Sequence, residues 1–167
     1  MKKYISFLIL TFFISTFSFA QNDLEKTREA FRLASKTEEQ AEKFNNLMKA
    51  EDLDLEENLH KVYLGASEAT LAKFHALGEG KIKSAKAGKK HIEEAVKADK
   101  ENLEIRLVRL IIQENTPKIA GYKENIEEDK EFIIKHFKST STDIQHYIKK
   151  VIEETEIFNE KEINQLD

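Results

Sequence analysis

The chain has 167 residues, with 27 basic and 31 acidic side chains, five glycines, one proline and neither cysteine nor tryptophan. The absence of cysteine excludes disulfide scaffolds, cysteine–zinc sites and thiol nucleophiles. The low glycine and proline content excludes collagen-like and low-complexity chains.

Residues 1–20 have the layout of a secretory signal peptide. Lys2 and Lys3 precede a long apolar run, and the small residues Ser18 and Ala20 stand at the expected cleavage site. The run is shorter than the roughly 20 residues that span a bilayer, and no later segment approaches that length. The sequence therefore predicts an exported protein, periplasmic or secreted, with no integral membrane segment after cleavage.

The rest of the chain, residues 21–167, is expected to form a single all-helical domain. Loss of the two leader lysines leaves 25 basic against 31 acidic residues, a formal net charge of −6. A chain of this length can bury about two-thirds of its unfolded surface. No linker longer than about six residues interrupts the pattern, so no domain boundary is predicted.

Apolar residues after Leu24 recur at helical spacing and almost never alternate. The pattern predicts helices over about 23–36, 81–98, 101–114, 123–137 and 160–166, and three more that carry the apolar groups of 41–48, 62–77 and 144–152. Four capping boxes are expected: Thr37 with Gln40, Asp54 with Glu57, Thr142 with Gln145, and Asn159 with Glu162. Short loops between helices favour antiparallel neighbours, so the fold class is an all-α antiparallel array.

The helix over 101–114 is apolar on two opposite sides. One side carries Leu103, Leu107, Leu110 and Ile111, and the other carries Ile105, Val108 and Ile112. A helix apolar on both sides is sandwiched between neighbours, so we expect it at the centre of the domain. The preceding helix, over 81–98, is expected to turn Ile82, Ala85, Ile92, Ala95 and Val96 inward.

Residues 64–115 resemble part of a tetratricopeptide-repeat array. The matching positions are the pair Leu64–Gly65, the residues Gly88, Ile92 and Ala95, and the turn 98–102, where Lys100 replaces the proline of the family. Gly65 and Gly88 are 23 residues apart, about twice the family spacing. The order of segments is also similar to that of small exported bacterial proteins of unknown function. The resemblance implies a right-handed α-α stack of about seven helices, and it implies no activity.

Motifs for catalysis or metal binding are missing from the sequence. Glu57 and His60 form one E-x-x-H pair, and Asp143 and His146 have the same spacing with aspartate in place of glutamate. A di-iron bundle needs two E-x-x-H pairs and two further glutamates. Neither H-E-x-x-H nor G-x-S-x-G occurs. We therefore predict no catalytic residue, no metal site and no cofactor.

Five lysines between residues 81 and 90 form a basic run without an acidic residue: Lys81, Lys83, Lys86, Lys89 and Lys90. A nucleic-acid interface would require a basic domain and interleaved aromatic residues, so no nucleic-acid partner is predicted. The run is interpreted as a solvated helix face near the acidic segments 51–57 or 127–131. Binding of anionic polymers or lipid head groups is the functional alternative.

Four side chains are candidates for a binding groove: Tyr63, Arg106, Arg109 and Tyr122. The two arginines lie between the apolar sides of the 101–114 helix. They are either structural, each paired with a carboxylate because a buried charge needs a partner, or they line a groove and bind a carboxylate of a ligand. Each tyrosine is either part of the core or an aromatic anchor for a partner.

Helical stacks of this kind present a concave surface and commonly bind proteins or peptides, although a fold does not determine a function. The leading hypothesis is an exported, non-enzymatic helical scaffold or protein-interaction module with an unidentified protein or peptide partner. The first alternative is a helical envelope protein that binds a small ligand or a metal, and the second is an enzyme with an unrecognised site.

Overall fold

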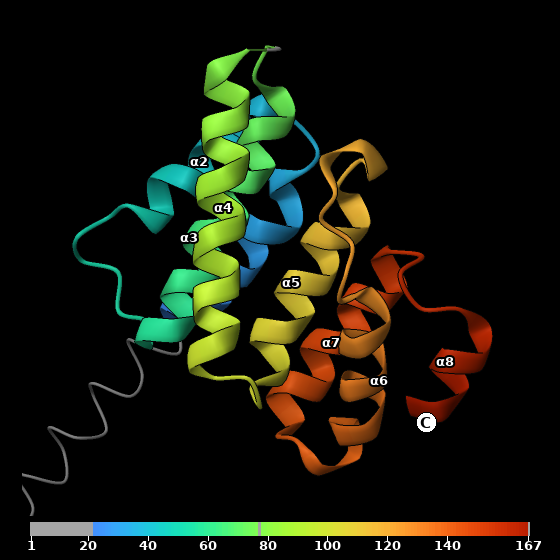
Figure 1. Cartoon of the computed structure of the whole chain (residues 1–167). Coiled ribbons are helices and arrows are strands. Elements are labelled where there is room, and N and C mark those ends of the chain that lie inside the picture. Colours follow the sequence, from blue (N-terminus) through green and yellow to red (C-terminus); the bar gives the residue numbers. More distant parts are fainter. Residues whose placement is uncertain (1–21, 77, 167) are drawn as a thin grey trace, which may run out of the picture.

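The computed structural model describes residues 22–76 and 78–166, and the predicted signal peptide lies outside these ranges (Figure 1). An N-terminal helix over 22–34 is followed by α2 (Glu38–Met48), α3 (Glu57–Phe74), α4 (Glu79–Ala98), α5 (Leu103–Asn115), α6 (Ile126–His136), α7 (Thr142–Glu154) and α8 (Glu160–Leu166). Two short 3₁₀ helices, η1 (Lys118–Ala120) and η2 (Phe137–Ser139), complete the described ranges, which contain no strand. The all-α prediction is confirmed.

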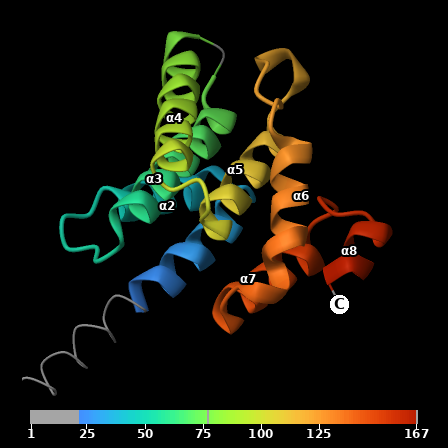
Figure 2. The same ribbon diagram turned by 60° about the horizontal axis from the view of Figure 1, so that its bottom comes forward.

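The helices are arranged on two sides of α5. Helices α3 and α4 form a long antiparallel hairpin on one side, together with α2 and the N-terminal helix, and α6, α7 and α8 lie on the other side (Figures 1 and 2). Within the described residues, no helix combines the length and apolar character needed to cross a bilayer.

Helix α5 contributes to two separate hydrophobic clusters, as its two apolar sides predict. Ile105, Val108 and Ile112 belong to the cluster shared with the N-terminal helix, α2, α3 and α4. Leu107 and Leu110 belong to the cluster shared with α6, α7 and α8. The predicted central position of this helix is confirmed.

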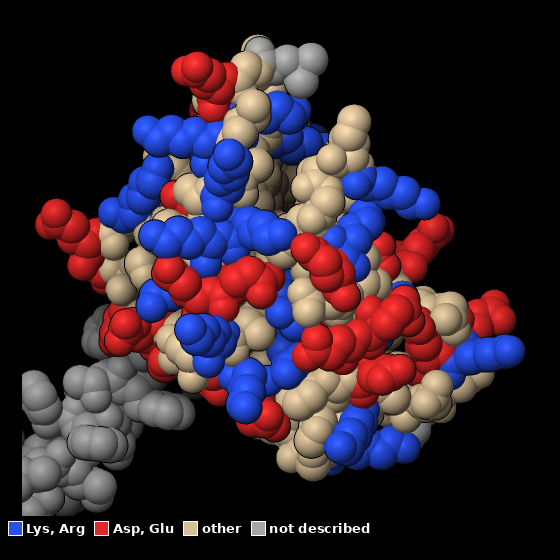
Figure 3. Space-filling model, in the orientation of Figure 1, with Lys and Arg blue, Asp and Glu red and all other residues tan. Residues whose placement is uncertain are grey.

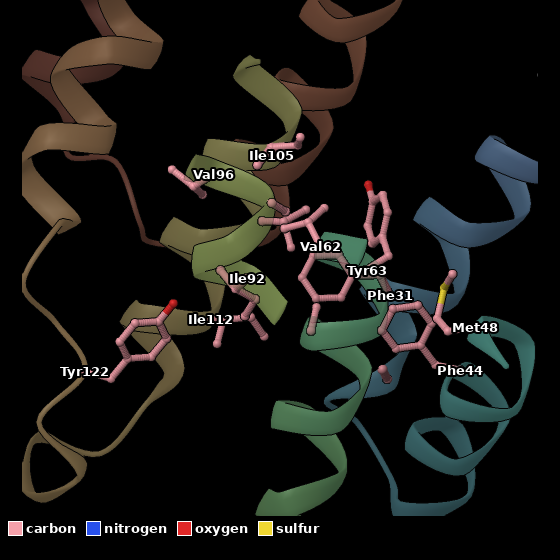
Figure 4. Packing of buried hydrophobic residues seen from close by; sticks show 14 residues of the cluster. Phe31, Phe44, Met48, Val62, Tyr63, Ile92, Val96, Ile105, Ile112 and Tyr122 are labelled. Carbon is pink, nitrogen blue, oxygen red and sulfur yellow. The ribbon is translucent and has the colours of Figure 1, made fainter. Parts of the chain in front are cut away.

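The first cluster contains an aromatic triad. The ring centroids of Phe31 and Phe44 are 5.6 Å apart, and both rings contact Tyr63 in edge-on geometry (Figure 4). Such tilted and edge-to-face pairs add to the stabilisation that comes from area burial. The triad joins the N-terminal helix, α2 and α3.

Two of the four predicted capping boxes mark the true helix starts. The Thr37 hydroxyl accepts a hydrogen bond from the amide of Gln40, and Asn159 and Glu162 each accept one from the other's backbone amide. The N-cap residues predicted for the other two helices are wrong by one or two positions. The Glu56 carboxylate caps α3 in place of Asp54, and Ser141 caps α7 in place of Thr142. Thr142 and Ser141 are both favoured N-cap residues, so the pattern alone leaves the start of α7 ambiguous, whereas Glu56 is not a favoured N-cap residue and was for that reason not expected.

Helices α3 and α4 touch through their backbones where Gly65 meets Gly88. A Cβ atom placed on Gly88 would lie 2.6 Å from the carbonyl oxygen of Gly65, and one placed on Gly65 would lie 2.7 Å from the carbonyl oxygen of Gly88. Because both obstructing atoms belong to backbone, neither helix can accept a side chain there without moving. The two glycines therefore set the closest approach within the hairpin.

Replacing Gly88 with alanine is expected to lower the free energy of unfolding by about 1–3 kcal/mol, because the added methyl group overpacks a backbone contact. Gly80, in the first turn of α4, is the matched control because a Cβ atom placed on it would have no neighbouring atom within 4 Å. Gly80→Ala is expected to be neutral or stabilising, since alanine is the better helix former. Urea denaturation measures both, and equal midpoints would contradict the backbone contact.

The expected inward orientation of Ile82 and Ala85 is wrong. Ile82 is 56% exposed, Ala85 is exposed as well, and the buried residues of α4 begin only at Gly88. The first turns of α4 project beyond the rest of the molecule together with the end of α3 (Figure 1). Helical periodicity identifies an apolar face but does not show whether a neighbour covers it.

Candidate functional site

Arg106 and Arg109 extend from α5 toward α6, where both bind Asp129. The Arg109 guanidinium donates from Nε to Oδ2 and from Nη2 to Oδ1, each over 2.7 Å, and Arg106 Nη1 donates to Oδ1 over 3.0 Å. Asp129 has no exposed surface. Burial alone would lower the pKa of Arg109, but the bonds and charge of Asp129 outweigh it and raise that pKa above its ordinary value. If the two arginines are structural and do not bind a ligand, each must be paired with a carboxylate, and these contacts provide that pairing.

The Arg106 guanidinium has three further contacts. Its Nε donates to the carbonyl oxygen of Lys100 over 2.6 Å, and Nη1 also donates to Glu128 over 2.8 Å. Its central carbon lies 4.2 Å from the centroid of the Phe132 ring. The hydrogen bond from Arg106 holds the pKa of the Glu128 carboxyl below its usual range.

Tyr122 joins the same network through Glu93 of α4. The Tyr122 hydroxyl donates to Glu93 Oε1 over 2.6 Å, and the other oxygen of Glu93 accepts from Arg109 over 3.2 Å. Burial and the neighbouring Glu93 carboxylate raise the pKa of Tyr122 above its ordinary value. The hydroxyl therefore stays protonated at neutral pH and acts as a hydrogen-bond donor.

Tyr63 belongs to a second buried network that is centred on Glu104. The Tyr63 hydroxyl donates to Glu104 Oε1 over 2.6 Å, and Arg28 binds the same carboxylate with two hydrogen bonds of 2.7 and 2.8 Å. The hydroxyl oxygens of Tyr63 and Tyr147 are 3.3 Å apart. Burial, followed by the charge of Glu104, raises the pKa of Tyr63 well above its ordinary value. This network joins the N-terminal helix, α3, α5 and α7.

The structure thus brings three of the four candidate residues together and places the fourth elsewhere. Arg106, Arg109 and Tyr122 are linked through shared carboxylates, whereas Tyr63 lies in the Glu104 network. Sequence reasoning did not identify Arg28, Glu104 and Tyr147. Glu104 could have been identified by the pattern that identified the arginines, because it is also a charged residue within a helix that is apolar on both sides. Ligand binding by the four candidate residues stays a prediction.

One cleft in the described part of the chain has a volume of about 740 Å³ and lies over the C-terminal ends of four helices. Its lining comes from the N-terminal helix, α3, α5, α7 and the residues that directly follow them. Apolar side chains, including Phe31, Ala69 and Ile111, contribute to its surface, and charged side chains, including Lys36, Lys73 and Glu114, line it as well. The cleft therefore combines apolar contact area with charges of both signs.

A second cleft, of about 470 Å³, lies between the N-terminal helix and α7. Arg32 lines both clefts and forms an ion pair with Glu154, across the two helices. Arg28 also reaches across, donating to Asp143 over 2.9 Å. These ion pairs link the N-terminal helix to α7.

Three of the four residues of the E-x-x-H pairs have other partners. His60 Nε2 lies 2.9 Å from the carbonyl oxygen of Met48, and Glu57 lies 3.8 Å from the Lys61 ammonium group. Asp143 accepts from Arg28. Over residues 22–76 and 78–166, no group of three or more His, Cys, Asp or Glu side chains has a metal-binding arrangement.

The lysine run lies on the exposed side of α4. Lys89 pairs with Glu124 over 3.2 Å, and Lys90 pairs with Glu94. These acidic partners lie outside the segments 51–57 and 127–131 that the sequence favoured. No ion pair is formed by the other three lysines with any described residue.

Comparisons of the chain with protein-family models, with curated proteins and with solved structures find no match.

Proposed function

We propose that this chain is an exported, non-enzymatic helical scaffold whose 740 Å³ cleft binds a segment of a partner protein. One observation carries the proposal: every residue that lines the cleft belongs to the N-terminal helix, α3, α5, α7 or the turns that follow them. Alternate helices of a hairpin stack line the concave face, which such proteins use for binding. The proposed architecture is therefore a right-handed, tetratricopeptide-like stack.

Two features of the α3–α4 hairpin support this architecture. Gly65 and Gly88, which correspond to small positions of the family, are in direct contact. The wide sequence spacing between them is taken up by the outer halves of both helices, since α3 continues to Phe74 and α4 begins at Glu79. The hairpin is thus proposed to be a lengthened form of one repeat.

The composition of the cleft favours a peptide segment as its occupant. Apolar side chains of the partner can contact Phe31, Ala69 and Ile111, while charges of either sign find a counterpart in Lys36 or Glu114. An apolar centre with a polar rim is the usual anatomy of a protein interface.

Site-specific photo-crosslinking in the native envelope tests this function. A photoreactive residue at Asn115, which is exposed and lines the cleft, is expected to capture a discrete protein partner. The same residue at Lys43, an exposed position of α2 outside the cleft, is the control. Capture at Lys43 but not at Asn115 would contradict binding in the cleft.

A further inference from the structure

Two large apolar side chains stand out among the described residues because they are exposed: Ile82, at 56%, and Ile119, at 99%. Ile82 lies in the first turn of α4, and Ile119 is the middle residue of η1. The two segments are far apart in sequence but lie at the same end of the molecule in two views that differ by 60° (Figures 1 and 2). We call this end, formed by residues 78–86 and 117–121, the tip.

The tip is positively charged although the protein as a whole is acidic. It contains four lysines, namely Lys81, Lys83, Lys86 and Lys118, and one acidic residue, Glu79. None of the four lysines forms an ion pair with a described residue. Basic side chains crowd the upper part of the face that α4 presents, whereas acidic ones gather lower on the molecule (Figure 3).

The outward side of α4 continues this pattern along the helix. Ile82, Lys86 and Lys90 follow each other at four-residue spacing and so lie on one side of the helix. Binding of protein surfaces to the interface of an anionic bilayer combines burial of apolar side chains with attraction between basic side chains and anionic lipids, and this side of α4 offers both.

We propose that the tip docks on an anionic lipid bilayer, with Ile82 and Ile119 entering the interface and the lysines contacting lipid phosphates. Juxtamembrane lysines are attracted to anionic lipids within about one Debye length of the surface, roughly 10 Å. Ile82 and Ile119 favour a bilayer over an anionic polymer, because a polymer offers no hydrocarbon to cover them. Glu79 opposes the attraction but is outnumbered by the lysines. This docking is independent of a partner in the cleft.

Vesicle co-sedimentation tests whether the lysines of the tip bind anionic lipids. The protein beginning at Gln21 is used, since all described contacts lie within 22–166. It is expected to bind vesicles of phosphatidylglycerol and phosphatidylcholine, and not vesicles of phosphatidylcholine alone. The triple variant Lys81→Gln, Lys83→Gln, Lys86→Gln is expected to bind at least about tenfold more weakly.

A matched variant removes the same charge elsewhere. Lys43, Lys97 and Lys135 are exposed and lie outside the tip, and their triple replacement by glutamine is expected to retain most of the binding. Equal losses in the two triple variants would overturn docking through the tip. So would equal binding of the unaltered protein to both kinds of vesicle.

The entry of the apolar side chains into the bilayer can be measured separately by tryptophan fluorescence, because the chain contains no tryptophan of its own. Ile119→Trp introduces a single tryptophan, whose selectively excited emission is expected to shift to shorter wavelength on adding anionic vesicles. Lys97→Trp, at the opposite end of α4, is the control and should not shift. Binding without a shift at residue 119 would overturn the entry of Ile119 into the interface and indicate contact with the lipid phosphates alone.

Discussion

Replacement of Asp129 by alanine is expected to lower the free energy of unfolding by about 3–5 kcal/mol, because it leaves two buried arginines without their shared carboxylate. Arg109 would keep only the 3.2 Å contact with Glu93, and Arg106 would keep Glu128 and the carbonyl oxygen of Lys100. A domain of this size has only about 5–15 kcal/mol of stability in total. The midpoint of urea denaturation measures the change.

Glu127→Ala is the matched control for this substitution. Glu127 also lies in the first turn of α6, so both variants lose one negative charge near the same helix N-terminus, but Glu127 is exposed. An exposed residue of this kind is expected to change stability by about half a kcal/mol or less. Similar midpoints for the two variants would show that the Asp129 network does not stabilise the fold.

The same network predicts a smaller effect for a substitution at Arg106. Arg106→Met leaves Asp129 with both of its hydrogen bonds from Arg109. Its cost should therefore be smaller than that of Asp129→Ala, since no buried carboxylate is left without a cation.

Leu107→Ala is expected to cost about 2–5 kcal/mol, because the side chain is fully buried and its loss opens a cavity between packed helices. Leu107 lies in the cluster that joins α5 to α6, α7 and α8. Leu33 of the N-terminal helix is only partly buried and serves as the control, with a smaller expected loss. Equal urea midpoints for the two alanine variants would contradict the central position of α5.

The helical pattern, the central helix and two of the capping boxes could be predicted from sequence. These features depend on residues close together along the chain: three- and four-residue spacing for the helices, and a single turn for the caps. The exposure of Ile82 could not be predicted from the same local pattern. Its position on an apolar stripe is local information, but its exposure depends on whether a distant segment covers it.

The partners of the charged residues could not be predicted in the same way. The position of Arg106 and Arg109 on a doubly apolar helix indicated that each arginine would need a carboxylate if buried. The chain contains 31 acidic residues, and nothing local distinguishes Asp129 from the others. Its selection follows from the packing of α6 against α5, which places one carboxylate within reach of both guanidinium groups.

The helical class and the residues that share one face of each helix follow from the amino-acid sequence, because periodicity and capping act within a few turns of one helix. The helices that line the cleft, the carboxylate that binds each arginine and the apolar residues that remain exposed at the tip follow only from how the helices pack together. Those outcomes depend on contacts between segments far apart in the chain, such as Arg28 with Glu104, and such contacts carry no local signature.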